Sequence, residues 1–73
     1  MSIGNNIRSR RQEMLWSQEE LGLKVGVTQE MISQIEKGTK LPSLVLGAAI
    51  ANAFGCSVDD LLKTKKEEHH GET

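Results

Sequence analysis

The stretch that decides the fold of this chain is residues 18–37, QEELGLKVGVTQEMISQIEK. It contains two short amphipathic segments separated by Gly26, Val27 and Thr28. A linker of about three residues that contains Gly joins two helices at a steep angle, so the second helix projects from the domain as a ridge. Gly22, in the first segment, permits the close approach of the two backbones that such an angle requires.

The second segment, residues 29–37, has two different faces. At about 100° per residue, one arc is mostly apolar, and we expect it to face the core. This inner arc consists of Met31, Ile32, Ile35 and Glu36. The outer arc carries side chains that donate or accept hydrogen bonds, namely Gln29, Glu30, Ser33, Gln34 and Lys37. Any solvated amphipathic helix has a polar outer face, so this pattern alone does not establish a ligand.

The rest of the chain predicts an all-α domain, because apolar residues recur at helical spacing and strict two-residue alternation is absent. Ser17 and Ser57 each precede acidic residues in the pattern of a capping box, which marks the start of a helix. The predicted helices span residues 4–14, 18–25, 29–37, 44–54 and 58–63. The fourth of them is apolar on nearly all sides, which places it in the middle of a bundle or across a subunit contact.

Length and composition limit the chain to one small domain. Its 73 residues are 37% hydrophobic, enough for one modest core over residues 1–64. The polar segment 65–73 is expected to be a disordered tail. The single Cys56 cannot form an internal disulfide, and no apolar run approaches the length of a membrane span. We therefore expect a cytoplasmic protein, bacterial or phage-encoded and associated with the nucleoid.

The charge balance is the main argument against a nucleic-acid partner. The formal net charge is −1, with 9 basic and 10 acidic residues. Residues 65–73 hold two Lys and three Glu, so residues 1–64 carry seven charges of each sign and are neutral. Domains that bind nucleic acids are more often basic. Near-neutrality predicts weak non-specific binding, because that binding comes mostly from attraction to phosphates.

Residues 3–62 resemble the helix-turn-helix domain of the phage-repressor and Cro family, often called Xre-like. The family pattern through the two central helices is matched by Gln18, Leu21, Gly22, Val25, Gly26, Val27, Ile32 and Ile35. Outside them it is matched by Ile7, Arg10-Arg11, Glu36-Lys37-Gly38, Pro42-Ser43, Ile50-Ala51, Val58 and Leu61-Leu62. Gly22 stands where Ala is commoner and Leu23 where a polar residue is usual, and neither departure breaks the motif. The resemblance implies a compact five-helix, lambda-repressor-like DNA-binding domain.

In function, the resemblance implies a sequence-specific DNA-binding transcriptional regulator, expected to be a repressor, that inserts helix 29–37 into the major groove as a dimer. Gln suits an adenine edge and Glu accepts a hydrogen bond from cytosine. The candidates for base readout are Gln29, Glu30, Ser33 and Gln34. The candidates for phosphate contacts are Arg10, Gln18, Thr28, Lys37 and Lys40.

Two further groups of residues have expected roles. An unpaired carboxylate on the inner arc is costly, and family members carry an Arg–Glu ion pair at the matching positions, so Arg11 and Glu36 are expected to form a structural ion pair. Surplus apolar surface around Phe54, Val58 and Leu62 is the candidate dimer contact. Simple core packing is the alternative for each of these three residues.

A different class of function stays open, namely a protein-interaction module such as the antitoxin of a toxin–antitoxin pair. Glu30 and the neutral balance favour that alternative, whereas the outward Gln and Ser side chains favour DNA. The predicted partners are a pseudo-palindromic double-stranded operator, a second copy of the chain and, in the alternative, a protein. The sequence has no catalytic set or phosphate loop, and His69-His70 has no third ligand nearby. We therefore expect no enzyme activity, cofactor or metal.

Overall fold

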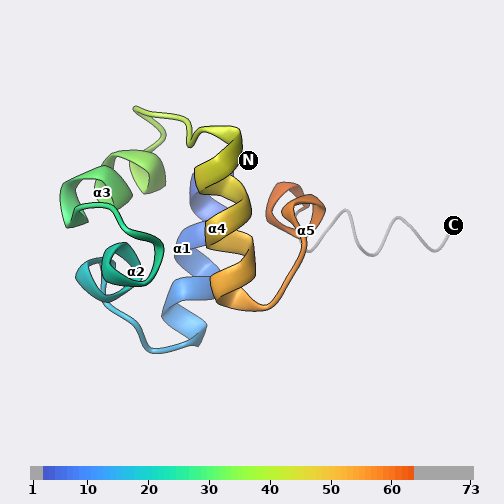
Figure 1. The fold of residues 1–73 in the computed structure, drawn as a ribbon, viewed down its shortest axis with the longest axis horizontal. Helices are drawn as coiled ribbons and strands as arrows, with labels where there is room; N and C mark the ends of the chain where they lie inside the picture. The colour runs from blue at the N-terminus through green and yellow to red at the C-terminus, as the bar shows by residue number, and fades with distance from the viewer. Residues whose placement is uncertain (1–2, 64–73) are drawn as a thin grey trace, which may run out of the picture.

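The computed structural model describes residues 3–63, which form five helices and no strand (Figure 1). The helices are α1 (Ile3–Glu13), α2 (Gln18–Val25), α3 (Gln29–Lys37), α4 (Leu44–Phe54) and α5 (Val58–Leu62). The predicted all-α class and the predicted bounds of α2, α3 and α4 are confirmed. Helix α1 begins and ends one residue earlier than predicted, and α5 ends one residue earlier. The predicted tail, residues 65–73, lies outside the described residues.

Helix α1 ends where the backbone of Leu15 takes a left-handed conformation, with φ of 62°. The Trp16 N–H donates to the Arg11 carbonyl and the Leu15 N–H to the Gln12 carbonyl, which is the hydrogen-bond pattern of a Schellman cap. Glycine usually occupies this position, because a Cβ atom strains the left-handed conformation. The Leu15 side chain is 88% exposed, so it gains little from packing in return.

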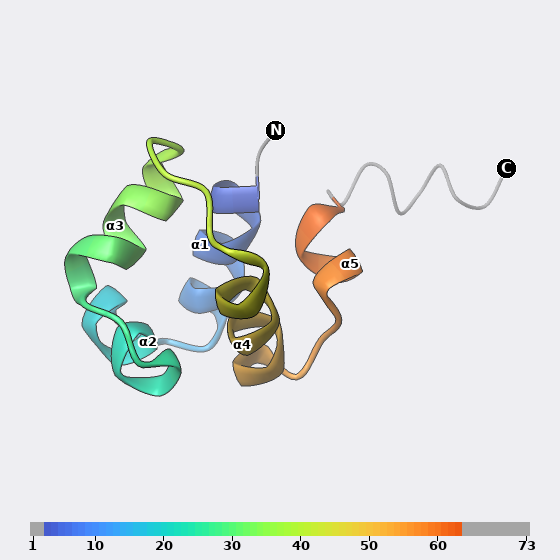
Figure 2. The same ribbon diagram turned by 45° about the horizontal axis from the view of Figure 1, so that its top comes forward.

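The core lies between α1 and α4, which stand side by side in the middle of the molecule, and the helices around them (Figures 1 and 2). Helices α2 and α3 pack together on one side, while α5 packs against α1 and α4 on the other. All five helices contribute to the buried apolar cluster, which consists of Ile7, Leu21, Ile32, Ile35, Ile50, Ala51 and Leu61. This arrangement leaves α3 at the outer edge of the domain.

The predicted dimer contact is only partly free in the structure. Phe54 stacks on Trp16 with ring centroids 5.6 Å apart, and Val58 also packs against the core. Both residues thus contribute to core packing while half-buried, Leu62 is 51% exposed, and the dimer contact of all three stays a prediction. Helix α4 is central as predicted, but its first residues, Leu44 and Val45, are 84% and 80% exposed. Burial along α4 begins with half-buried Leu46, which packs against the core, and buried Gly47.

Two expectations about absent features concern the described part of the chain. None of the helices within residues 3–63 has the length and apolar character needed to cross a bilayer. In the same residues, no three His, Cys, Asp or Glu side chains lie together as a metal site requires. His69 and His70 lie outside the described residues.

Candidate nucleic-acid interface

The turn between α2 and α3 sets the direction of α3. Gly26 ends α2 in the left-handed conformation, with φ of 81°, and the Val27 N–H donates to the Gly22 carbonyl at 2.9 Å. A Cβ atom on Gly22 would lie 2.6 Å from the Val27 carbonyl oxygen, closer than real Cβ contacts come. The absence of a side chain at Gly22 therefore lets the turn lie directly against α2. From this turn α3 leads away along the edge of the domain (Figure 2).

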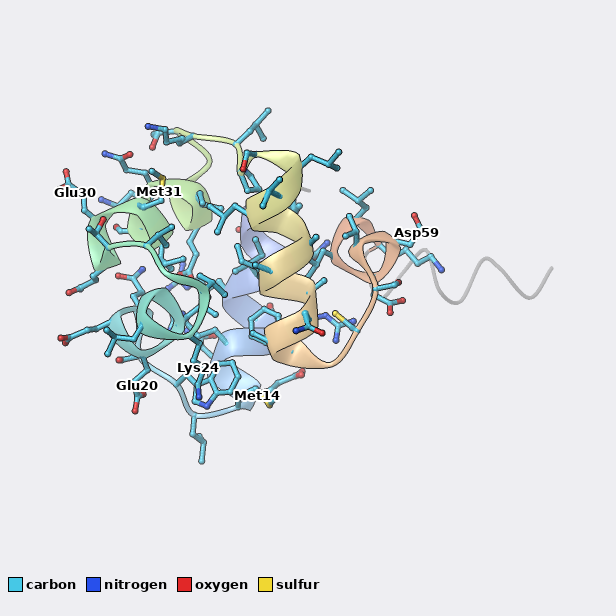
Figure 3. The ribbon with its side chains drawn as sticks, in the orientation of Figure 1. Met14, Glu20, Lys24, Glu30, Met31 and Asp59 are labelled. Atoms are coloured by element: carbon cyan, nitrogen blue, oxygen red, sulfur yellow. The ribbon has the colours of Figure 1, made fainter. Side chains whose placement is uncertain are left out.

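Helix α3 buries one face and presents the other, as the sequence predicts. Ile32 and Ile35 are 0% and 1% exposed, and they anchor the helix in the core. The outer face contains exposed Gln29, Glu30 and Lys37 together with half-buried Ser33 and Gln34. Figure 3 shows the Glu30 side chain pointing away from the body of the molecule. The polar face is thus open to a ligand and is not pressed against the protein's own interior.

The start of α3 retains hydrogen-bond donors that no group in residues 3–63 uses. The Thr28 hydroxyl oxygen accepts the Met31 N–H at 3.2 Å, which makes Thr28 the N-cap of the helix. The hydroxyl hydrogen of Thr28 is left over from this contact. The backbone N–H groups of Gln29 and Glu30 also have no partner among the described residues. Such donors, at the positive end of the helix dipole, suit an anion such as a phosphate.

Three helices meet at the carboxylate of Glu36. The Arg11 Nε donates to its Oε2 at 2.7 Å and the Arg11 Nη2 to its Oε1 at 3.1 Å, so the expected ion pair is present and bidentate. The Arg11 Nη1 also donates to the Trp16 carbonyl at 2.8 Å. In addition, the Gln18 Nε2 donates to the Glu36 Oε1 at 3.1 Å, a contact that sequence reasoning missed. This last bond holds the start of α2 beside the last turn of α3.

Arg10, another candidate for a phosphate contact, lies near the start of α5. Its guanidinium is close enough to Asp60 and Cys56 to favour the ionised form of both groups. The phosphate contact of Arg10 stays a prediction. A helical wheel places Arg10 only relative to its own helix, whereas the packing of α5 decides what the side chain faces. Lys37 and Lys40, by contrast, are exposed at the end of α3 and in the following loop.

An exposed apolar surface that the sequence analysis did not single out covers the loop after α3 and the first turn of α4. Leu41, Leu44 and Val45 are 78%, 84% and 80% exposed. Their large apolar side chains stand within five consecutive residues, which makes the exposure a feature of one region. Solvent-exposed apolar clusters of this kind mark contact surfaces more often than singly scattered apolar residues do. The only sequence signal for this region was the nearly uniform apolar character of the fourth helix.

Known helix-turn-helix proteins are similar to this chain over most of its length. The family model for helix-turn-helix proteins matches residues 7–61. The HTH-type transcriptional regulator YgzD of Bacillus subtilis is 38% identical over 63 residues, which cover 86% of this chain and 96% of the relative.

Two solved structures share the fold. The P22 c2 repressor in complex with a synthetic operator has a TM-score of 0.82 and 38% identity, with 86% of this chain and 96% of that chain covered. SinR, the master regulator for biofilm formation, in complex with DNA, has a TM-score of 0.78 and 32% identity, with 84% and 98% covered. Both structures have a DNA partner in their crystals, and both align with nearly the whole described domain.

Proposed function

This chain belongs to the helix-turn-helix family of the phage-repressor type, the DNA-binding transcriptional regulators, and we propose that it represses transcription by inserting α3 into the major groove as a homodimer. The observation that carries the proposal is the open polar face of α3 on a helix whose opposite face is fully buried. An α-helix fits the major groove, where each base pair presents a distinct pattern of donors and acceptors. The protein acts in the cytoplasm, where its DNA target lies.

Base readout is assigned to the four polar residues along the outer face of α3. Gln29 and Glu30 are exposed on its first turn, and Ser33 and Gln34 lie one turn later. A Gln amide pairs bidentately with an adenine edge, and the Glu30 carboxylate accepts from the amino group of cytosine. A carboxylate that approaches DNA is repelled by phosphates, so Glu30 contributes to selectivity by rejecting sites without a donor at that position.

Phosphate contacts are assigned to Gln18, Thr28, Lys37 and Lys40. Thr28 has an unused hydroxyl hydrogen, and Gln18 has a second amide N–H beyond the one that Glu36 accepts. Lys37 and Lys40 supply the positive charges. Contacts of this kind position a protein on the duplex, while the base contacts specify the sequence.

The homodimer is assigned to the exposed apolar surface of Leu41, Leu44 and Val45, with Leu62 as a further candidate. One α3 reads only a few base pairs, so two copies that bind half-sites about one DNA turn, ~34 Å, apart provide the affinity of an operator. Val45→Asn does not change the net charge. We expect it to weaken binding to a duplex with two half-sites and to leave binding to a single half-site unchanged. Sedimentation that finds one chain per two-half-site duplex would contradict the dimer.

Selection of binding sites from random duplex DNA, followed by gel-shift titration, tests the DNA-binding function. The wild-type chain should enrich one pseudo-palindromic sequence. Gln34→Ala should lose about 1–3 kcal/mol of binding free energy and relax the preference at one position in each half-site. Asp59→Asn is the matched control, because Asp59 lies at the opposite end of the molecule from Glu30 (Figure 3).

Several outcomes would count against the proposal. Failure to enrich any sequence would reject DNA readout and favour the protein-interaction alternative. An unchanged base preference in Gln34→Ala would reject the assignment of that residue. A reporter promoter that overlaps the selected site should be expressed less when the protein is present, and increased expression would reject repression.

A further inference from the structure

The contact between Gln18 and Glu36 determines which way the amide of Gln18 faces. The Glu36 side chain is only 3% exposed, and its ionised carboxylate accepts hydrogen bonds but donates none. The Gln18 Nε2 lies 3.1 Å from the Glu36 Oε1, which accepts its N–H. If the amide rotated by half a turn, its own oxygen would face the carboxylate, and two acceptors would repel each other. Glu36 therefore holds the amide in one of its two orientations.

This orientation leaves a donor available at the start of α2. A Gln amide nitrogen carries two hydrogens, and Glu36 accepts only one of them. The second N–H has no partner among the described residues, and Gln18 as a whole is half-buried. The backbone N–H groups of Gln18 and Glu19, in the first turn of α2, are also unpaired within residues 3–63. All of these groups are donors, and a phosphate oxygen is an acceptor.

We infer that Glu36 is a positioning residue for DNA binding, acting through Gln18 by orienting its amide to donate to a backbone phosphate. The inference rests on the proposed function and adds to Glu36 a role beyond stability. Arg11 is also needed, because its bidentate contact neutralises the Glu36 carboxylate, which would otherwise repel the phosphate. One buried carboxylate thus links α1, α2 and α3 and selects the donor side of a surface amide.

Removal of the Glu36 carboxylate should change DNA affinity in opposite directions, depending on whether Glu36 acts by orienting Gln18 or only through its charge. Glu36→Met takes one negative charge from a chain of net charge −1, so charge alone predicts tighter DNA binding. Positioning predicts weaker binding, because the free amide then presents its oxygen to the phosphate part of the time. We expect a loss of about tenfold in affinity, comparable to one hydrogen bond to a charged group.

The experiment is a double-mutant cycle on the folded protein, with a fluorescent duplex that carries the site selected by the wild-type chain. Affinities of wild type, Gln18→Ala, Glu36→Met and the double variant are measured by anisotropy below the lowest melting temperature. Glu36→Met should lose about tenfold when Gln18 is present and less than twofold when it is absent. Arg11→Lys is the matched control, because it disturbs the same ion pair and leaves the Gln18–Glu36 bond in place.

A spectroscopic measurement without DNA separates orientation from general destabilisation. In ¹⁵N–¹H spectra, one of the two side-chain amide protons of Gln18 should exchange slowly in wild type and in Arg11→Lys. Both protons should exchange fast in Glu36→Met. If Glu36→Met does not fold, the pair Arg11→Met with Glu36→Met replaces it, because this pair leaves no unpaired buried charge.

Each outcome decides between the proposals. Equal or tighter binding by Glu36→Met, or the same loss with and without Gln18, would overturn the positioning role and leave the DNA-binding function intact. Fast exchange of both Gln18 amide protons in wild type would overturn it as well. If the wild-type chain selects no site, the proposed function fails, and the positioning role fails with it.

Discussion

At the scale of single residues, Glu36 is the buried charged residue whose stability contribution depends most on its partner. Its side chain is 3% exposed and that of Arg11 is 11% exposed, so neither charge is well solvated. No buried side-chain nitrogen or oxygen in residues 3–63 lacks a hydrogen-bond partner. A buried ion pair adds little to stability over an apolar pair of the same size, but removal of one partner leaves an uncompensated charge.

We therefore expect Glu36→Ala to lower the free energy of unfolding by about 3–5 kcal/mol. Glu19→Ala, at an exposed position in the first turn of α2, should change it by no more than about 0.5 kcal/mol. Thermal or urea unfolding followed by circular dichroism measures both values. Equal stability of the two variants would place the ion pair outside the core.

Leu15 is a second residue at which a local feature, backbone strain, lowers stability. Its left-handed φ of 62° is strained for a residue with a Cβ atom, and its side chain is 88% exposed. Leu15→Gly should stabilise the domain by roughly 0.5–1 kcal/mol, since relief of strain exceeds the entropy gained by the unfolded chain. Leu23→Gly, at an exposed position inside α2, should instead destabilise it by about 1 kcal/mol. A lower melting temperature for Leu15→Gly would show that Leu15 makes a compensating contact.

At the scale of elements, short polar signals define the helices more strongly than their length does. Four of the five described helices begin at a Ser or Thr whose side chain accepts a backbone N–H in the first turn; these are Ser17, Thr28, Ser43 and Ser57. Three described helices end at a left-handed glycine. These caps matter because helices of five to eleven residues are too short to be stable alone.

The cap of α5 predicts a dependence of stability on pH. Hydrogen bonds from Ser57, first from its backbone N–H and then from its side chain, hold the pKa of Asp60 below its ordinary value of 3.8. A depressed pKa in the folded state means that the carboxylate stabilises the fold above pH 3.8. This contribution is lost as the pH falls from 3.8 through the folded-state pKa.

Urea unfolding at a series of pH values from neutral to acid measures this contribution. Asp60→Asn should lose stability at neutral pH and show a weaker acid dependence than wild type. Asp59→Asn keeps the Ser57 N–H donating to the Asp60 carboxylate and the Asp60 N–H donating to the Ser57 hydroxyl, so it should keep the wild-type dependence. An identical acid dependence in wild type and Asp60→Asn would refute the assignment.

Two glycines inside helices predict opposite responses to the same change. Gly22→Ala places a Cβ 2.6 Å from the Val27 carbonyl, so the turn must move and α3 with it. We expect a cost of about 1–3 kcal/mol in stability, with a further loss of DNA affinity. Gly47→Ala has nothing within 4 Å and should stabilise α4 by up to about 1 kcal/mol. Unfolding curves and gel shifts of both variants test this contrast.

At the scale of the whole molecule, the formal net charge is only −1, but the charges are unevenly placed. Lys37 and Lys40 lie at the end of α3 and in the loop after it, while Asp59 lies at the far end of the molecule from α3 (Figure 3). Arg10 is near Asp60, so it adds little positive charge to the proposed DNA face. If the proposed DNA contacts hold, specific affinity comes mainly from directed hydrogen bonds and from the proposed binding of two copies to two half-sites.

We accordingly expect a shallow salt dependence of DNA binding. The slope of log affinity against log salt is about −0.9 for each phosphate that a cation neutralises, so few lysines give a small slope. Lys40→Ala should reduce the slope by about one, and Lys63→Ala, at the end of α5, should leave it unchanged. A steep wild-type slope that persists in Lys40→Ala would show that other cations contact the DNA.

The helices, their caps and the inward face of α3 were predictable, because they depend on residues close together in the chain. Capping patterns and helical spacing located α2, α3 and α4 without reference to the rest of the molecule. The pairing of Arg11 with Glu36 came from family resemblance, since 25 residues separate them. The contact of Gln18 with the same carboxylate and the position of Arg10 required the assembled domain. Such contacts follow from how whole helices pack, and the spacing of residues within one helix does not determine that packing.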